Sequence, residues 1–279
     1  MGNGRSTRPV AVEDIAAEAL TLAGGGRALL LQIAHPAVGR GVVDHSDFAS
    51  RLMDRFDGTV LYLTATMYGS PAEQAAIRRL VNRAHAPVRG VDPASGASYN
   101  AFDPDLQLWV AATLYQTMMD LHARVFGPLS PEQHDIAYQR LSRALSNLQL
   151  TVDRWPADRA AFDEYWERMI ATLRVDADVL AVSRQILYPS GVAWWLRPGL
   201  PLLRLVTSGL LPPAVRAQFH LGWSGARQRR FDRTMRCISR LYPRLPLRLR
   251  HLLRDRYLAR LRRLVPAAAE TAGSTSAEG

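Results

Sequence analysis

The sequence predicts an all-α fold in a single globular domain of many helices. Apolar residues recur at spacings of three and four along most of the chain, which is the period of a helix that buries one face. Paired runs of alternating apolar and polar residues are missing, so a sheet is not expected. The chain has 279 residues, 48% of them hydrophobic, enough for a core that encloses a bound molecule. We expect the domain to span residues 11–265, between a flexible N-terminus (1–10) and a disordered tail (266–279).

The segment 60–68 is the place where a strand competes with a helix. It begins with Val60 and is rich in β-branched and aromatic residues, which favour strands. A strand here would have no partner, because no second alternating run accompanies it. We therefore expect a helix that is pressed between other helices.

Four further helices are predicted by their first residues and their apolar stripes. One begins after Asp103, has Pro104 in its first turn, and is apolar on most sides, so it should be buried. A second begins at Ser130, where the spacing to Gln133 fits a capping box. A third follows Asp158, and a fourth lies in the Arg-rich part of the chain. The stripes of these last two helices are Phe162, Tyr165, Trp166, Met169, Ile170 and Leu173, and Phe231, Met235, Ile238 and Tyr242.

All 35 basic residues are arginine, because the sequence contains no lysine. Schiff-base chemistry, a lysine general base and P-loop nucleotide binding all need a lysine and are excluded. Between residues 191 and 264 there are 17 arginines and only two acids, Asp232 and Asp255. These arginines have no interleaved aromatic platform, so no specific nucleic-acid site is expected. Solvated helix faces explain the charge, and so does peripheral contact with an anionic membrane.

Cysteine usage and the apolar runs indicate the compartment. Cys237 is the only cysteine, which excludes an intramolecular disulfide and the Cys-rich zinc and iron–sulfur sites. No apolar stretch precedes Glu13, so a secretory signal is not expected. The apolar run 193–215 contains two arginines and four prolines and does not predict a membrane span. We therefore expect a cytoplasmic protein.

His85 is the most informative of the seven histidines, none of which forms an HExxH zinc pair. It lies in a predicted helix over residues 73–89, four residues after Val81 and three before Val88, and should face the interior. The apolar face of this helix is Ile77, Leu80, Val81, Ala84 and Val88. Two roles are open for His85: a core histidine bonded to a backbone carbonyl, which is the commoner case, or a ligand.

Two other groups of polar residues have the spacing of a binding site. Arg55 and Thr59 stand four residues apart, so on a helix they share a face and can bind one anionic group together. A solvated arginine beside an ordinary threonine is the simpler explanation. The cluster Asp44-His45-Ser46-Asp47 shows no recognisable order of a catalytic triad.

Several short blocks occur in an order that is more specific than any one of them. They are Leu30-Leu31-Gln32-Ile33-Ala34-His35-Pro36, Val43-Asp44-His45-Ser46, Arg55-x-x-x-Thr59, His85-x-x-Val88-Arg89-Gly90, Tyr99-x-Ala101-Phe102-Asp103-Pro104 with Trp109-Val110, Gly127-Pro128-Leu129-Ser130, and Leu210-Leu211-Pro212-Pro213-Ala214-Val215-Arg216. In this order, from about Gly26 to Pro246, the chain resembles the DUF2236 family, the catalytic domain shared by MpaB-type oxygenases and latex-clearing rubber oxygenases.

The resemblance implies a helical protein that holds haem b in a buried, haem-sized pocket. His85 would be the proximal iron ligand. Arg55 and Thr59 would help to fix the haem, at a propionate, and Arg89 is a further candidate for that role. The activity implied is that of an oxygenase that uses O₂ on a hydrophobic small molecule, with the haem supplying the chemistry.

The chain also departs from the family in ways that matter. Gly58 precedes Thr59 and no lysine exists, so any distal role of a lysine in rubber-cleaving members is absent. Ala111 and Ala112 follow the tryptophan block, where many members have a histidine. Rubber cleavage is therefore not implied. Two alternatives remain: a haem-binding or haem-sensing protein without turnover, and a non-catalytic helical protein that docks on anionic membranes through its Arg-rich third.

Overall fold

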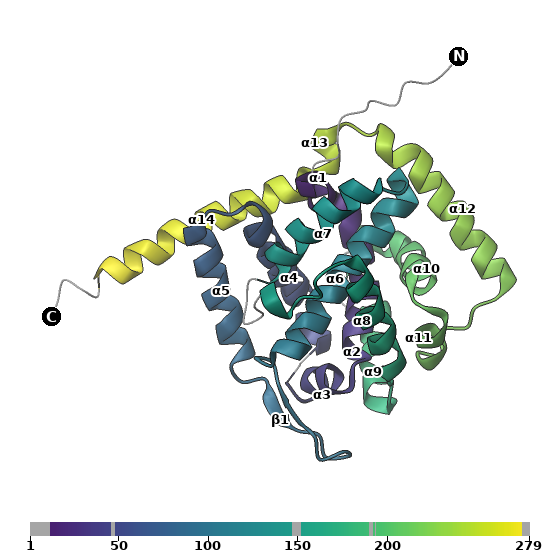
Figure 1. The fold of residues 1–279 in the computed structure, drawn as a ribbon, viewed down its shortest axis with the longest axis horizontal. Coiled ribbons are helices and arrows are strands. Elements are labelled where there is room, and N and C mark those ends of the chain that lie inside the picture. Colours follow the sequence, from purple (N-terminus) through teal and green to yellow (C-terminus); the bar gives the residue numbers. More distant parts are fainter. Residues whose placement is uncertain (1–11, 46–47, 147–151, 190–191, 193, 275–279) are drawn as a thin grey trace.

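The all-α prediction is confirmed by the computed structural model of the chain (Figure 1), which describes residues 12–45, 48–146, 152–189, 192 and 194–274. Before residue 86 the elements are α1 (Val12–Ala17), the 3-10 helix η1 (Ala19–Gly24), α2 (Gly25–Ile33), α3 (Pro36–His45), α4 (Phe48–Tyr68) and α5 (Pro71–His85). A hairpin of β1 (Arg89–Val91) and β2 (Ser98–Asn100) follows. The remaining elements are α6 (Pro104–Phe126), α7 (Pro131–Leu145), η2 (Val152–Arg154), α8 (Arg159–Thr172), α9 (Ala177–Leu187), η3 (Trp194–Gly199), α10 (Leu200–Leu210), α11 (Pro213–Gln218), α12 (Gly225–Leu241), η4 (Tyr242–Arg244), α13 (Leu247–Arg250) and α14 (Leu252–Ser274).

Helix α6 is the centre of the core, as its apolar sequence predicted. Most of its residues between Gln107 and Val125 are buried, and Trp109 is fully enclosed. The Trp109 Nε1 donates to Leu31 O at 3.2 Å, which fixes α6 against α2. The helix begins where the sequence predicted, because the Asp103 carboxylate accepts from Asp105 N at 2.8 Å. The other helices surround α6 in Figure 1.

The helices predicted at residues 130, 158 and 231 are also confirmed. Ser130 and Gln133 form the reciprocal capping box that opens α7. Asp158 caps α8 by accepting from Ala161 N at 2.8 Å. The starts of α7 and α8 are each determined by a side chain within three residues, which is why the sequence located them. For α12, which Ser224 caps, the sequence predicted the apolar stripe but not the start.

Segment 60–68 is helical, as expected, and belongs to α4. Helix α5 follows it after a tight turn in which Ser70 N donates to Glu73 Oε2 at 2.7 Å and Glu73 N donates to Ser70 Oγ at 3.3 Å. The two helices therefore run antiparallel and pack on each other. Helix α14 packs against both, and a cluster that includes Ala65, Ile77 and Leu261 is buried between them.

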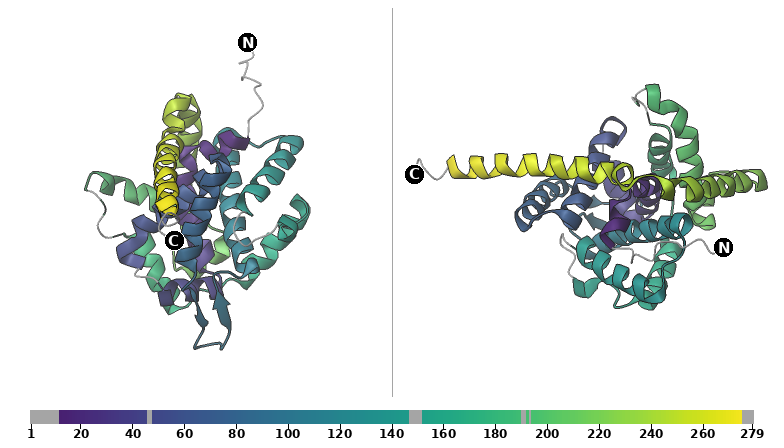
Figure 2. Two further views of the ribbon diagram at one scale, coloured as in Figure 1. Left: turned by 90° about the vertical axis from the view of Figure 1, so that its left-hand side faces the viewer. Right: turned by 90° about the horizontal axis from the view of Figure 1, so that it is seen from above.

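The hairpin between α5 and α6 was not predicted. Its two antiparallel strands pair Arg89 with Asn100, Gly90 with Tyr99 and Val91 with Ser98. Strands of three residues are too short to show an alternating pattern, so periodicity could not predict them. The hairpin projects from the helical body in the left view of Figure 2.

The structure describes the C-terminal end of the expected domain but not the segment that precedes it. The backbone of α14 continues to Ser274, past residue 266 where a disordered tail was expected. The alanine run 267–269 has high helix propensity, which favours continuation of the helix. The flexible segment expected over residues 1–10 lies outside the described residues. Within the described ranges, no helix is both long and apolar enough to cross a membrane.

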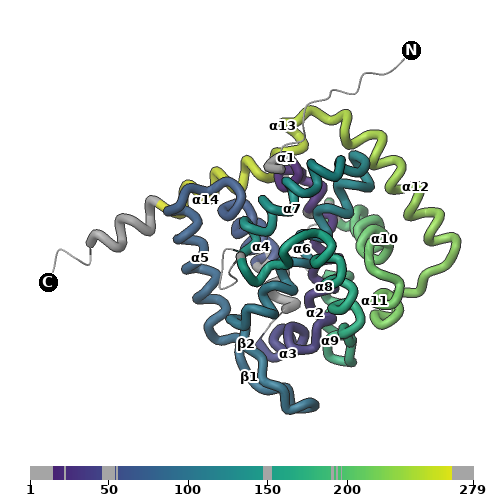
Figure 3. Tube along the Cα trace, in the orientation of Figure 1, coloured from purple at the N-terminus to yellow at the C-terminus, as the bar shows by residue number. Residues whose placement is uncertain are grey.

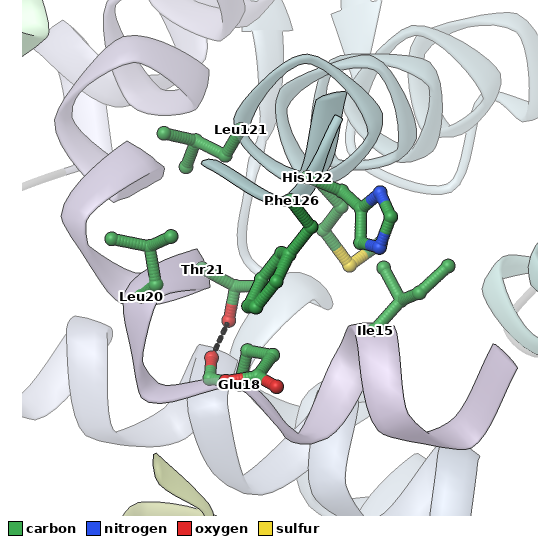
Figure 4. Close-up of a pocket in the computed structure, with 8 residues that line it drawn as sticks. Ile15, Glu18, Leu20, Thr21, Leu121, His122 and Phe126 are labelled. Carbon is green, nitrogen blue, oxygen red and sulfur yellow. Dashed lines mark hydrogen bonds between the residues drawn. The ribbon is translucent and has the colours of Figure 1, made fainter. Parts of the chain in front are cut away.

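Two small hollows are the best defined in the described part of the chain. One of about 10 Å³ lies where η1 meets α6, beside the hydrogen bond of 2.7 Å from Thr21 Oγ1 to Glu18 O (Figure 4). The other, of about 40 Å³, is lined by α9 and α10. The smaller volume is roughly what one water molecule needs, and the larger would hold only a few water molecules. Neither hollow is therefore large enough for a haem. The haem-sized pocket stays a prediction.

Candidate functional site

His85 is the last residue of α5 and is half-buried, with its Nδ1 shielded from solvent. Val88 N donates to His85 O at 2.9 Å, so the chain turns at once from the helix toward β1. Figure 3 follows this path from α5 into the hairpin. The imidazole therefore lies where a rigid helix ends, a position that holds a side chain more firmly than a free loop would.

The helix face on which His85 was predicted to lie is only partly buried. Ile77 is buried against α14, but Leu80 is 45% exposed and Ala84 is exposed. The prediction that all five apolar positions mark an inward face is wrong for these two residues. Helix α14 packs on the side of α5 that carries Ile77 and Val81, whereas Leu80 and Ala84 lie on a side that is open to solvent.

The α4–α5 pair carries three of the predicted site residues, Arg55, Thr59 and His85. Arg55 lies fifteen residues before Ser70 and His85 lies fifteen residues after it. Because a helix rises by about 1.5 Å per residue, each of these two positions is roughly 22 Å along its helix from the shared turn. Arg55 and Thr59 are four residues apart within α4, so they share a face of that helix. The side chain of Arg55 lies outside what the structure describes, and that of Thr59 is exposed.

Arg89, the fourth predicted site residue, lies in the hairpin. It is the first residue of β1, lies four residues after His85, and has an exposed side chain. A hydrogen bond holds its backbone in place, since His45 Nε2 lies 3.2 Å from Arg89 O. A carbonyl oxygen only accepts hydrogen bonds, so His45 contacts it with a protonated Nε2.

A polar network below the hairpin holds this strand in place, and the sequence did not predict it. Tyr99 Oη donates to Asp44 Oδ2 at 2.6 Å and lies 3.2 Å from His45 Nε2. Arg40 Nε donates to Asp44 Oδ1 at 2.9 Å. The hydrogen bonds from Arg40 and Tyr99 lower the pKa of Asp44 to about 2, so the carboxylate stays charged. Burial, followed by the bond to Asp44, raises the pKa of Tyr99 to about 12.

Gly90 is required for this arrangement. A Cβ added there would lie 2.6 Å from Tyr99 Oη, so a larger residue would displace the tyrosine ring from its bond to Asp44. The cluster around Asp44 had no interpretable order in the sequence because its partner, Tyr99, is 55 residues away. The only sequence signal was that both residues lie within blocks of the family resemblance.

His35 is a second histidine near the core that the sequence did not single out. It stands between α2 and α3, and its ring centroid is 6.5 Å from that of Trp109. Its Nδ1 is buried and has no hydrogen-bond partner among the described residues. Burial lowers the pKa of His35, so the ring is held neutral.

A bare metal ion would find too few ligands in the part of the chain that the structure describes. Among the described residues, no group of three or more His, Cys, Asp or Glu side chains could hold a metal ion. A metal ion bound directly by protein usually needs three or four such ligands. An iron that is already held by a porphyrin needs one imidazole from the protein, and cations or hydroxyls near its carboxylates.

Comparison with known proteins identifies the family of the chain. The model of the family described as "ER-bound oxygenase mpaB/B'/Rubber oxygenase, catalytic domain" matches residues 13–240. "Uncharacterized protein Rv2237" of Mycobacterium tuberculosis is 40% identical over 223 residues, which cover 77% of this chain and 87% of that protein. "Uncharacterized protein Mb2261" of Mycobacterium bovis has the same identity and coverage. No solved structure matches the chain. The chain therefore belongs to the family of MpaB and rubber oxygenase catalytic domains.

Proposed function

We propose that this protein is a haem b-dependent oxygenase that uses O₂ to oxidise a hydrophobic small molecule. The family to which the chain belongs is one of oxygenase catalytic domains, which supports an enzyme of this class. The observation that carries the proposal is the match of residues 13–240 to this family, together with the half-buried His85, whose Nδ1 is shielded from solvent. His85 and Arg55 both lie within blocks of the family resemblance, on the adjacent helices α5 and α4.

His85 is the proposed iron ligand. A neutral imidazole is the form that binds iron, and the His85 ring lies half-buried at the end of α5. Haem, when bound, supplies the activation of O₂ and the oxidising chemistry. The part of the chain in that reaction is to bind the cofactor, to orient it and to exclude competing partners.

Arg55, Thr59 and Arg89 are the proposed partners of the haem carboxylates. A guanidinium is always charged and donates two parallel hydrogen bonds to a carboxylate, and a threonine hydroxyl adds a third donor. Arg55 and Thr59 belong to α4, and Arg89 belongs to the hairpin. The Asp44–Tyr99–His45 network would then act indirectly, by fixing the strand that carries Arg89 at a set distance from His85.

Two variants test the ligand assignment. The protein would be expressed with a haem precursor, and its haem content and its absorption spectrum with dithionite and carbon monoxide would be measured. His85→Ala should remove the Soret band. His220→Asn is the matched control, because His220 is exposed and has a φ of 52°, a conformation that asparagine tolerates. Full haem content in the His85→Ala variant would exclude His85 as the ligand.

Turnover is tested separately from binding. Steady O₂ uptake with apolar substrates, lost together with the Soret band in His85→Ala, would support an oxygenase. A haem-loaded protein that consumes no O₂ with any of them would favour the alternative of a haem-binding or haem-sensing protein.

A further inference from the structure

The turn from α12 into α14 exposes an unusual number of leucines. Five lie at the surface between residues 241 and 252, and Leu241 is 66% exposed. We call this surface, with the arginines between the leucines, the Leu–Arg corner. Its leucines are Leu241, Leu245, Leu247, Leu249 and Leu252. The short helix α13 lies at the outer edge of the molecule, between α12 and α14 (Figure 1), and these two long helices extend from it in opposite directions in the right view of Figure 2.

Polar residues of the same turn face inward, which is the reverse of ordinary packing. Tyr242 Oη donates to Glu18 Oε2 at 2.8 Å, and Arg250 Nε donates to the same oxygen at 3.0 Å. His251 is only 5% exposed. Because these residues anchor the turn, the leucines between them cannot rotate into the core without breaking a buried ion pair. Their exposure is therefore a fixed property of the fold.

The charge on the corner has one sign. Arg240, Arg244 and Arg248 alternate with the leucines, and all three are exposed. Between residues 233 and 254 the chain contains no acidic residue. None of the three arginines forms an ion pair with a carboxylate of the described residues. The corner thus presents apolar side chains and unneutralised positive charge to the same surroundings.

We infer that the Leu–Arg corner docks the protein on the surface of an anionic membrane. Leucines that project from a convex edge can enter the acyl boundary of a bilayer, which deforms around them, while guanidinium groups bind the lipid phosphates. An apolar patch of this kind marks an interaction surface. A protein partner would need a concave acidic surface of matching shape, whereas a bilayer supplies negative charge and an apolar layer without such matching.

The test uses the full-length protein and vesicles. Flotation with vesicles of phosphatidylcholine alone, and of phosphatidylcholine mixed with phosphatidylglycerol, should show binding to the anionic vesicles only. Replacing the three arginines by glutamine should lower that binding by on the order of a hundredfold at low salt. Replacing Leu241, Leu247 and Leu249 by serine should lower it by about tenfold or more, also at high salt.

A control variant separates the corner from the overall charge. Arg143, Arg168 and Arg184 are exposed on α7, α8 and α9, so their replacement by glutamine removes the same charge from other surfaces. This variant should keep most of the binding. Circular dichroism and thermal unfolding of every variant verify that it is folded.

Three results would overturn the inference. One is no binding of the parent protein to anionic vesicles at low salt. Another is an equal loss of binding in the corner and control variants. The third is a dimer, measured by sedimentation, that the leucine variant abolishes, because the corner would then be an interface between copies of this chain.

Discussion

Removing the carboxylate of Glu18 should destabilise the protein more than any surface substitution. Glu18 is 4% exposed and receives hydrogen bonds from Tyr242 and Arg250, so a single buried carboxylate joins the start of the chain to its C-terminal third. The Arg250 side chain is 14% exposed and its guanidinium carbon lies 4.9 Å from the centre of the Phe126 ring. In Glu18→Gln this guanidinium would remain largely buried without its counter-charge.

The structure sets the size of the effect. Breaking a buried ion pair from one side costs about 3–5 kcal/mol, and the partial exposure of Arg250 points to the lower end, about 3 kcal/mol. At roughly 2–4 °C per kcal/mol for a chain of this size, the melting temperature should fall by about 6–12 °C. Replacing both partners, as in Glu18→Gln with Arg250→Met, should restore most of the loss because no charge is then left unpaired.

Thermal and urea unfolding of the single and double variants measure these changes. Asp255→Asn is the matched control, since Asp255 pairs with Arg254 at an exposed site, where such a pair contributes only about 0–1 kcal/mol. If Glu18→Gln were no more destabilising than Asp255→Asn, the argument that a buried ion pair fixes this junction would be refuted.

Further predictions concern two glycines and one core histidine, His122. Gly90→Ala should lower the free energy of unfolding by about 1–3 kcal/mol, because the new Cβ meets Tyr99 Oη. Gly58→Ala in α4 should raise it by roughly 0.5–1 kcal/mol, because nothing lies within 4 Å of the new Cβ and alanine favours a helix. Urea unfolding measures both changes, and changes of the same sign would contradict the packing described. Burial lowers the pKa of His122 below 6.5, so the unfolded chain binds this proton more readily and stability should fall as the pH drops through about 6.5. In His122→Gln the free energy of unfolding should depend less on pH below about 6.5. If the dependence on pH were unchanged, groups other than His122 would cause it.

The candidate site could be predicted in part. The ordered blocks indicated the family, which is confirmed, and supplied His85, Arg55, Thr59 and Arg89 as candidates. Only the structure showed that α4 and α5, which carry Arg55, Thr59 and His85, pack on each other. Their roles toward a haem stay predictions, which the spectra of the His85 variant would test.

The sequence by itself determined the features that depend on neighbours within about four residues. The start of α7 follows from the capping box of Ser130 and Gln133. The helical state of segment 60–68 follows from the lack of a second strand that could pair with it. The three-residue strands of the hairpin escaped because their pattern is shorter than the period that reveals a strand.

Tertiary structure alone decided which faces are covered and which distant groups meet. Leu80 has the spacing of a buried residue but is exposed, because α14 packs on the side of α5 that carries Ile77 and Val81. The leucines of the Leu–Arg corner face outward because Arg250 is drawn inward to Glu18, 232 residues earlier in the chain. Contacts at such separation depend on the packing of whole helices, and local periodicity has no information about them.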